Sequence, residues 1–138
     1  MFFNLLYSNF FFYFCFMKIL GNIIWLLFGG IAIFFEYLVG GMLLCITIIG
    51  IPFGLQVFKL AFVALWPFGT KIENTQNSSG CLNILMNIIW LLFGGIWIAL
   101  SHAVIGIIMA ITIIGIPFAI QHFKLAGVAL SPFGKTIK

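Results

Sequence analysis

Charged side chains are almost missing from this sequence. Only 6% of its 138 residues are charged, and these are six lysines and two glutamates. A soluble domain carries about 25% charged residues, because its surface must be wetted by water. With 64% apolar residues and a mean hydropathy of +1.32, most of this chain must be solvated by lipid. We predict an all-α membrane protein whose main partner is the lipid bilayer.

The groups that several functions need are missing too. Ser-His-Asp, Cys-His and paired-carboxylate arrangements are all lacking, so we expect no catalytic residue and no enzyme. The three cysteines form no CxxC pair, and His102 and His122 are too far apart in sequence to indicate a metal site. We therefore expect no metal and no cofactor. Both histidines are predicted to pack at the membrane interface, with a proton relay through His122 and Lys124 as the alternative. Singly scattered lysines do not indicate nucleic-acid binding.

What the chain does contain is a duplication. Residues 19–72 align with residues 84–137 at a constant offset of 65, and 35 of the 54 paired positions are identical. The repeated blocks are NIIWLLFGGI, ITIIGIPF and QxFKLAxVALxPFG. Chance does not produce such agreement, so the chain is a tandem repeat.

The duplication defines the predicted domains. We place the two repeats at 19–69 and 84–138, joined by a linker at 70–83 whose Asn, Ser, Thr and Gly content is typical of a solvated segment. Residues 1–18 have no counterpart and form an apolar N-terminal extension, in which Met17 is an alternative start.

Each repeat is too long for one membrane crossing. A membrane helix needs about 20 residues, whereas 47 residues run from Ile19 to Leu65 with few polar interruptions. We predict a turn at 36–41, where Glu36 contacts water beside a glycine pair, and the matching turn at 101–106. The result is a tandem pair of two-helix transmembrane hairpins with four helices, at 20–35, 42–66, 85–100 and 107–131.

The lysines favour this topology. Lys18, Lys71, Lys135 and Lys138 fall on one face if each repeat crosses twice, and lysine is held on the cytoplasmic side during insertion. Both termini and the linker are then cytoplasmic. A single crossing per repeat would invert the second copy, as in many transporters, and is the alternative.

A break is predicted in the second helix of each repeat. Gly-Ile-Pro occurs at 50–52 and 115–117, and proline lacks an N–H and clashes with the preceding turn, so we expect a kink in each helix. The hydroxyls of Thr47 and Thr112 lie just upstream and are candidates to satisfy the freed carbonyls. The residues of the breaks are Gly50, Pro52, Gly115 and Pro117.

The paired blocks resemble the YccF family, a bacterial inner-membrane component domain that occurs as two such units. The blocks NIIWLLFGG and ITIIGIPFGxQxFKLAxxALxPFG carry the resemblance, over about residues 19–137. It implies that this multi-pass chain lies in the bacterial inner (cytoplasmic) membrane, and it implies no reaction or substrate. The second copy departs from the first at Ala119, where the first has Gly54, and at Ser131, where it has Trp66.

Polar residues recur on one face of the second helix. Gln56 and Lys59 lie three residues apart, as do Gln121 and Lys124. Polar groups inside a membrane usually face the bundle interior or a water-filled path, although a lysine also extends its long stem to the interface. The candidate pathway-lining residues are Thr47, Gln56, Lys59, Thr112, Gln121 and Lys124.

Two functions fit these features. Four helices enclose little space, so we expect a homo-oligomeric channel or transporter for a small ion or solute. The alternative is a non-transporting membrane component that scaffolds or regulates a larger complex, with a protein partner that the sequence does not identify.

Overall fold

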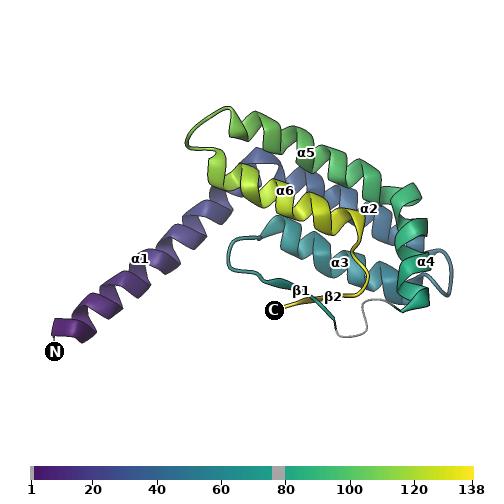
Figure 1. Ribbon diagram of the computed structural model, residues 1–138, viewed down its shortest axis with the longest axis horizontal. Coiled ribbons are helices and arrows are strands. Elements are labelled where there is room, and N and C mark those ends of the chain that lie inside the picture. The colour runs from purple at the N-terminus through teal and green to yellow at the C-terminus, as the bar shows by residue number, and fades with distance from the viewer. Residues whose placement is uncertain (1, 76–79) are drawn as a thin grey trace.

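Each copy of the repeat folds into a helical hairpin with a tight turn at its tip (Figure 1). The computed structural model describes the backbone of residues 2–75 and 80–138 and the side chains of residues 8–75 and 80–138. Its elements in chain order are α1 (Phe2–Trp25), the kinked segment η1 (Leu26–Gly30), α2 (Ile31–Cys45), α3 (Ile51–Leu65), β1 (Ile72–Asn74), α4 (Cys81–Trp90), the π-helical segment η2 (Leu91–Gly95), α5 (Ile96–Ala110), α6 (Ile116–Leu130) and β2 (Lys135–Ile137).

Two helical stretches are long and apolar enough to cross a membrane. They are Ser8–Cys45, which runs from α1 through α2, and Cys81–Ala110, which runs from α4 through α5. A helix satisfies its own backbone hydrogen-bonding groups, which lipid requires. The helices α3 and α6 have 15 residues each, so at 1.5 Å per residue they are about 22 Å long, against about 30 Å for the hydrocarbon core. Four crossings therefore stay a prediction.

The chain reverses later than predicted in both copies. The predicted turns at 36–41 and 101–106 are wrong, because both segments lie inside α2 and α5. The reversals are at 46–50 and 111–115. A charged residue can lie within an apolar helix when its side chain has a hydrogen-bonding partner. The Glu36 carboxylate accepts such a hydrogen bond, of 2.8 Å, from the Ser101 hydroxyl. Glu36 is therefore part of a helix contact and not of a wet turn.

Gly-Ile-Pro begins a helix instead of kinking one. Pro52 and Pro117 lie in the first turn of α3 and α6, where a missing N–H breaks no hydrogen bond. The predicted kink within a continuous second helix is wrong, although the helical structure does break beside these residues. A Cβ on Gly50 would lie 2.0 Å from the carbonyl oxygen of Leu44, so this turn requires glycine.

Thr47 and Thr112 close the two turns. The Thr47 hydroxyl donates to the Leu44 carbonyl (3.2 Å) and accepts from the Gly50 N–H (3.1 Å). Thr112 makes the same two bonds in the second copy, at 3.0 and 3.1 Å. Each tip is thus polar inside and apolar outside, as lipid requires. The exposed isoleucines of the tips are Ile46, Ile48, Ile49, Ile111, Ile113 and Ile114.

The two hairpins point in opposite directions (Figure 1). The turn at 46–50 lies at the end of the molecule where α4 begins, and the turn at 111–115 lies beside α1. The first arms, α2 and α5, contact each other between them. Glu36 and Ser101, which bond across this contact, occupy equivalent positions of the repeat. The two copies are therefore related by an approximate twofold axis near this pair.

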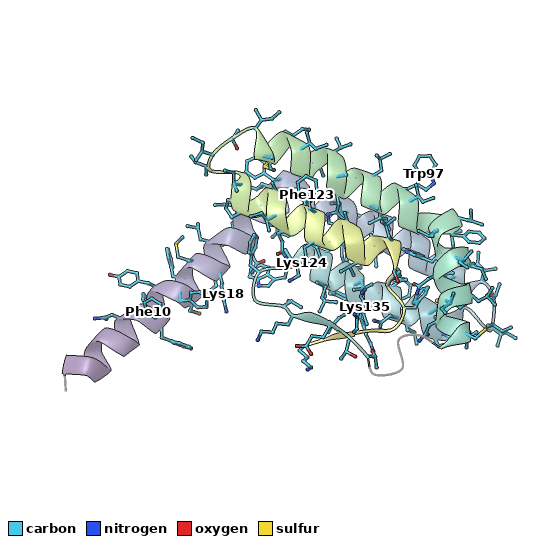
Figure 2. The ribbon with its side chains drawn as sticks, in the orientation of Figure 1. Phe10, Lys18, Trp97, Phe123, Lys124 and Lys135 are labelled. Carbon is cyan, nitrogen blue, oxygen red and sulfur yellow. The ribbon has the colours of Figure 1, made fainter. Side chains whose placement is uncertain are left out.

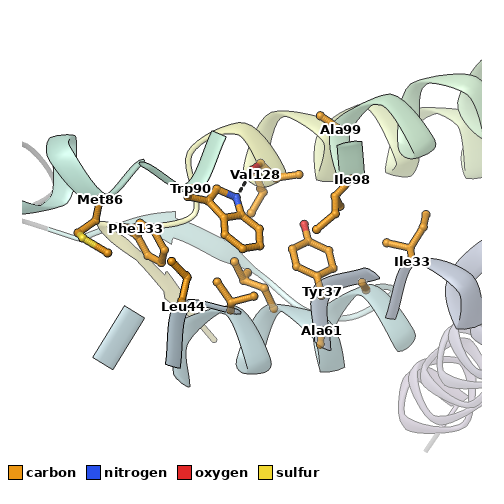
Figure 3. Packing of buried hydrophobic residues seen from close by; sticks show 14 residues of the cluster. Ile33, Tyr37, Leu44, Ala61, Met86, Trp90, Ile98, Ala99, Val128 and Phe133 are labelled. Atoms are coloured by element: carbon orange, nitrogen blue, oxygen red, sulfur yellow. Dashed lines mark hydrogen bonds between the residues drawn. The ribbon is translucent and has the colours of Figure 1, made fainter. Parts of the chain in front are cut away.

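One tryptophan from each copy joins the two hairpins. The indole N–H of Trp25 donates to the carbonyl of Ala64, and that of Trp90 donates to the carbonyl of Ala129, both at 2.7 Å within their own copies. Both rings are fully buried. The ring of Trp90 also stacks on Tyr37 of the first copy, with the centroids 6.4 Å apart, within the cluster drawn in Figure 3.

Candidate functional site

The ends of the two copies pair as a short β-ribbon. Strands β1 and β2 are antiparallel, with Ile72 opposite Ile137. Backbone hydrogen bonds in both directions between Lys71 and Lys138 (2.9 and 2.8 Å) extend the pairing. Because β1 follows α3 and β2 follows α6, both copies bring the chain to the same place.

An asparagine from each NIIW block positions these strands. The Asn22 amide donates to the Phe68 carbonyl and accepts from the Phe68 N–H, both at 2.9 Å. Asn87 and Phe133 repeat this pair of bonds at 3.1 and 3.0 Å. The next residue is glycine in both copies, and its φ of 105° at Gly69 and 88° in the second copy suits glycine best. The duplicated Asn and Pro-Phe-Gly thus hold the ribbon against the hairpins.

All six lysines gather around the ribbon. Lys18 lies beside the chain at Gly69. Lys59 borders a surface hollow that Ile137 of β2 also lines. Lys124 extends from α6 on the side where the ribbon lies (Figure 2). The remaining three belong to the strands or flank them, namely Lys71, Lys135 and Lys138.

A single acid faces these lysines among the described residues. Glu73 makes an ion pair with Lys138, and this hydrogen bond and the positive charge of Lys138 hold the pKa of Glu73 below its ordinary value. The Lys135 ammonium donates to the Asn74 amide oxygen at 2.9 Å. The ribbon and the lysines around it, which we call the basic face, therefore carry an excess of positive charge.

The structure does not bring the six predicted lining residues together. Thr47 and Thr112 lie in turns at opposite ends of the molecule. Lys59 and Lys124 are both exposed, and Lys59 borders a hollow that Ile137 of the ribbon also lines. The predicted set is thus divided between the two tips and the basic face.

The two glutamines of that set bond to the segments that flank the ribbon. The Gln56 amide donates to the carbonyl of Lys135 at 2.9 Å, and the Gln121 amide donates to the carbonyl of Pro67 at 3.5 Å. These bonds give each glutamine a structural reason to be polar. They satisfy backbone carbonyls at the place where the chain leaves the helices.

Sequence reasoning missed one buried polar pair. His102 on α5 and His122 on α6 are both fully buried, and their Nδ1 atoms are 2.9 Å apart. They lie at similar distances on either side of the turn at 111–115, so the hairpin brings them together. Because the turn was predicted at 101–106, His102 was placed in the turn itself and not on a helix opposite His122. Among the described residues no three His, Cys, Asp or Glu side chains come together, so a metal would find only these two nitrogens.

Comparison with known proteins agrees with this duplicated architecture. The YccF family, described as an inner membrane component domain, matches the chain twice, over residues 20–70 and 85–135. The inner membrane protein YccF of Escherichia coli (strain K12) is 32% identical over 130 residues, which cover 88% of this chain and 87% of that protein. The inner membrane protein YccF of Shigella flexneri matches to the same extent. No solved structure matches the chain. The chain belongs to the YccF family of inner-membrane component domains and is a protein of the bacterial inner membrane.

Proposed function

We propose that this protein is a non-enzymatic membrane component that binds an acidic protein partner through its basic face at the cytoplasmic surface. The observation that carries the proposal is the gathering of six lysines around the ribbon with one acid among them. A surface with one sign of charge steers a partner of the opposite sign and fixes its orientation.

The ribbon supports a cytoplasmic position for this face. The outer edges of a two-stranded ribbon carry unpaired backbone groups, which lipid does not tolerate, and lysine is held on the cytoplasmic side. Lys18 before the first hairpin lies beside Gly69 after it, and β1 pairs with β2 after the second. Each copy then begins and ends on the side of the membrane where the ribbon lies, which keeps both termini on that side.

The second candidate is the oligomeric channel or transporter. It is favoured by the exposure of Lys59 and Lys124 beside the ribbon, because several copies around one axis would turn these charges toward a shared path. The bonds made by Gln56 and Gln121 weigh against it, since both glutamines already serve the fold.

Site-specific photo-crosslinking in living cells tests the first candidate. A photoreactive residue at Thr136 on the ribbon should capture a defined protein, whereas one at Ile107, exposed on apolar α5, should not. Replacing Lys59, Lys71 and Lys124 with Gln should abolish the adduct without lowering membrane insertion. Equal capture at both positions, or capture that survives the lysine replacements, contradicts the proposal.

Liposome flux and the subunit number test the second candidate. The channel would be established instead if the purified protein is an oligomer and conducts an ion in the absence of any partner. The rate or selectivity of that conduction should then change in K59Q/K124Q. Under the first candidate the reconstituted protein gives no flux at any membrane voltage, and K59Q/K124Q behaves as the parent does.

A further inference from the structure

The histidine pair has an unusual hydrogen-bonding arrangement. His102 and His122 are the two histidines of the chain. Their Nδ1 atoms are 2.9 Å apart, so one nitrogen donates and the other accepts. Neither Nε2 atom makes a full hydrogen bond, and the backbone of Phe28 lies close to the His122 imidazole. A buried polar group normally has a partner, so the open Nε2 of His102 in an apolar hairpin requires an explanation.

The tautomers define what the pair can hold. With both rings neutral, the donor ring has an open Nε2 lone pair and the acceptor ring has a proton on Nε2. One added proton enters at the open lone pair and leaves the Nδ1–H···Nδ1 bond intact. That bond then becomes charge-assisted and stronger. A second added proton would place two N–H groups against each other over 2.9 Å and break it.

One aromatic neighbour of the pair favours a positive charge. The ring of Trp25 stacks on His122 with the centroids 4.0 Å apart, and the face of an indole attracts a cation. The centroid of His102 lies 6.4 Å from the same indole.

The other titratable groups on the elements packed here are directed elsewhere. Tyr37 of α2 stacks on Trp90, and Lys59 of α3 is exposed beside the ribbon. Lys124 of α6 is exposed on the side of the basic face. No charged side chain in the described part of the chain bonds to either imidazole.

We propose that His102 and His122 together form a binding site for one proton at the seam between the two copies of the repeat. The two imidazoles bind one added proton between them, and the environment of Trp25 changes when this proton binds. The indole of Trp25 stacks on His122 of the second copy and donates to the carbonyl of Ala64 on α3 of the first copy. Protonation therefore acts on the contact that joins the two hairpins.

The duplication supplies an internal control. Trp90 is equivalent to Trp25 and donates to Ala129 with the same bond length of 2.7 Å. Its neighbour in the first copy is Tyr37, and the position equivalent to His122 is Val57. A proton held by the histidines should therefore change the environment of Trp25 and leave that of Trp90 unchanged.

NMR of the full chain in nanodiscs, with 15N-labelled histidine and tryptophan, tests the proposal. Every imidazole signal comes from the pair, because the chain has two histidines. Between about pH 8 and about pH 4, on both sides of the ordinary imidazole pKa of about 6.5, we expect one coupled transition that corresponds to one added proton. The indole N–H signal of Trp25 should shift with the same midpoint, and that of Trp90 should stay in place.

Two results overturn the proposal. The first is independent protonation of both imidazoles, and the second is a pair that stays neutral over the whole range. The variant H122V installs the residue of the first copy and should remove both the coupled transition and the pH response of Trp25. An unchanged Trp90 signal shows that H122V is folded, and if H122V does not fold, the titration of the parent protein decides alone.

Discussion

The segment LLFGG occurs at 26–30 and again at 91–95, with identical residues and different backbones. In the first copy Phe28 (φ −97°, ψ 30°) and Gly29 (φ 119°) leave the helical region, so the axis bends between α1 and α2. In the second copy the glycine at the same position, Gly94, does not have a positive φ. Because the local sequence is the same, the difference must come from tertiary contacts.

The residue opposite LLFGG differs between the copies. In the first copy a Cβ on Gly29 would lie 2.6 Å from the Ile105 side chain. In the second copy Gly94 shares a hollow with Gly40, the residue equivalent to Ile105, and the Trp90 ring fills the space between them. A bulky side chain thus bends one copy, whereas a glycine leaves room for the other to stay regular. The duplication shows directly that packing overrides local propensity.

The largest effect is expected where the two copies agree. Gly50→Ala and Gly115→Ala would each place a Cβ about 2 Å from a backbone carbonyl oxygen (2.0 and 2.2 Å). Each should destabilise the protein by about 3 kcal/mol, the upper part of the usual range for overpacking. Thermal unfolding in detergent measures this loss. Gly127→Ala is the control, since a Cβ there has no neighbour within 4 Å; a parent-like Tm for G50A would show that the turn is built differently.

A somewhat smaller effect is expected where the copies differ. Gly40→Ile installs the residue of the second copy opposite η2, and its Cβ would lie 2.7 Å from the Trp90 ring. Displacement of this buried ring should cost about 1–3 kcal/mol. The same unfolding measurement applies, together with the indole signal of Trp90, which should move. If neither changes relative to G127A, Gly40 does not decide the shape of η2.

The limits of sequence reasoning follow from the same comparison. The membrane class and the two repeats were predictable, since they rest on composition and on repeated blocks, whereas Gly-Ile-Pro was recognised as a break but begins a helix instead of kinking one. The turn was misplaced because Glu36 and its glycine neighbours looked like a break, while their partners Ser101, Trp90 and Phe58 come from other helices. The histidine pair was missed as a consequence, because its two members meet only across the correct turn.

A third prediction concerns the bend itself. Ile105→Gly gives the first copy the environment of the second, so Gly29 should become helical. The side chain is only half-buried, so its removal should cost about 1 kcal/mol. Labelling with 13C-carbonyl phenylalanine and 15N-glycine selects the Phe-Gly peptide bonds, including Phe28–Gly29 and Phe93–Gly94. The Gly29 signal should move toward that of Gly94; a signal that stays in place would assign the bend to another cause.

The smallest effect is expected at Glu73 and Lys138, which occupy equivalent positions of the two copies with opposite charges. The pKa of Glu73 is lowered by its bond to Lys138 and by that charge, so the carboxylate is favoured in the folded state. Such a group stabilises the fold above its unfolded pKa, and this contribution disappears as the pH falls through the folded value, below about 4.5. Both side chains are exposed, so water and salt weaken the pair. Thermal unfolding of the parent and of E73Q should therefore differ slightly at neutral pH and low salt, and should coincide in acid or at high salt. A difference that persists in acid would mean that Glu73 acts through packing and not through its charge.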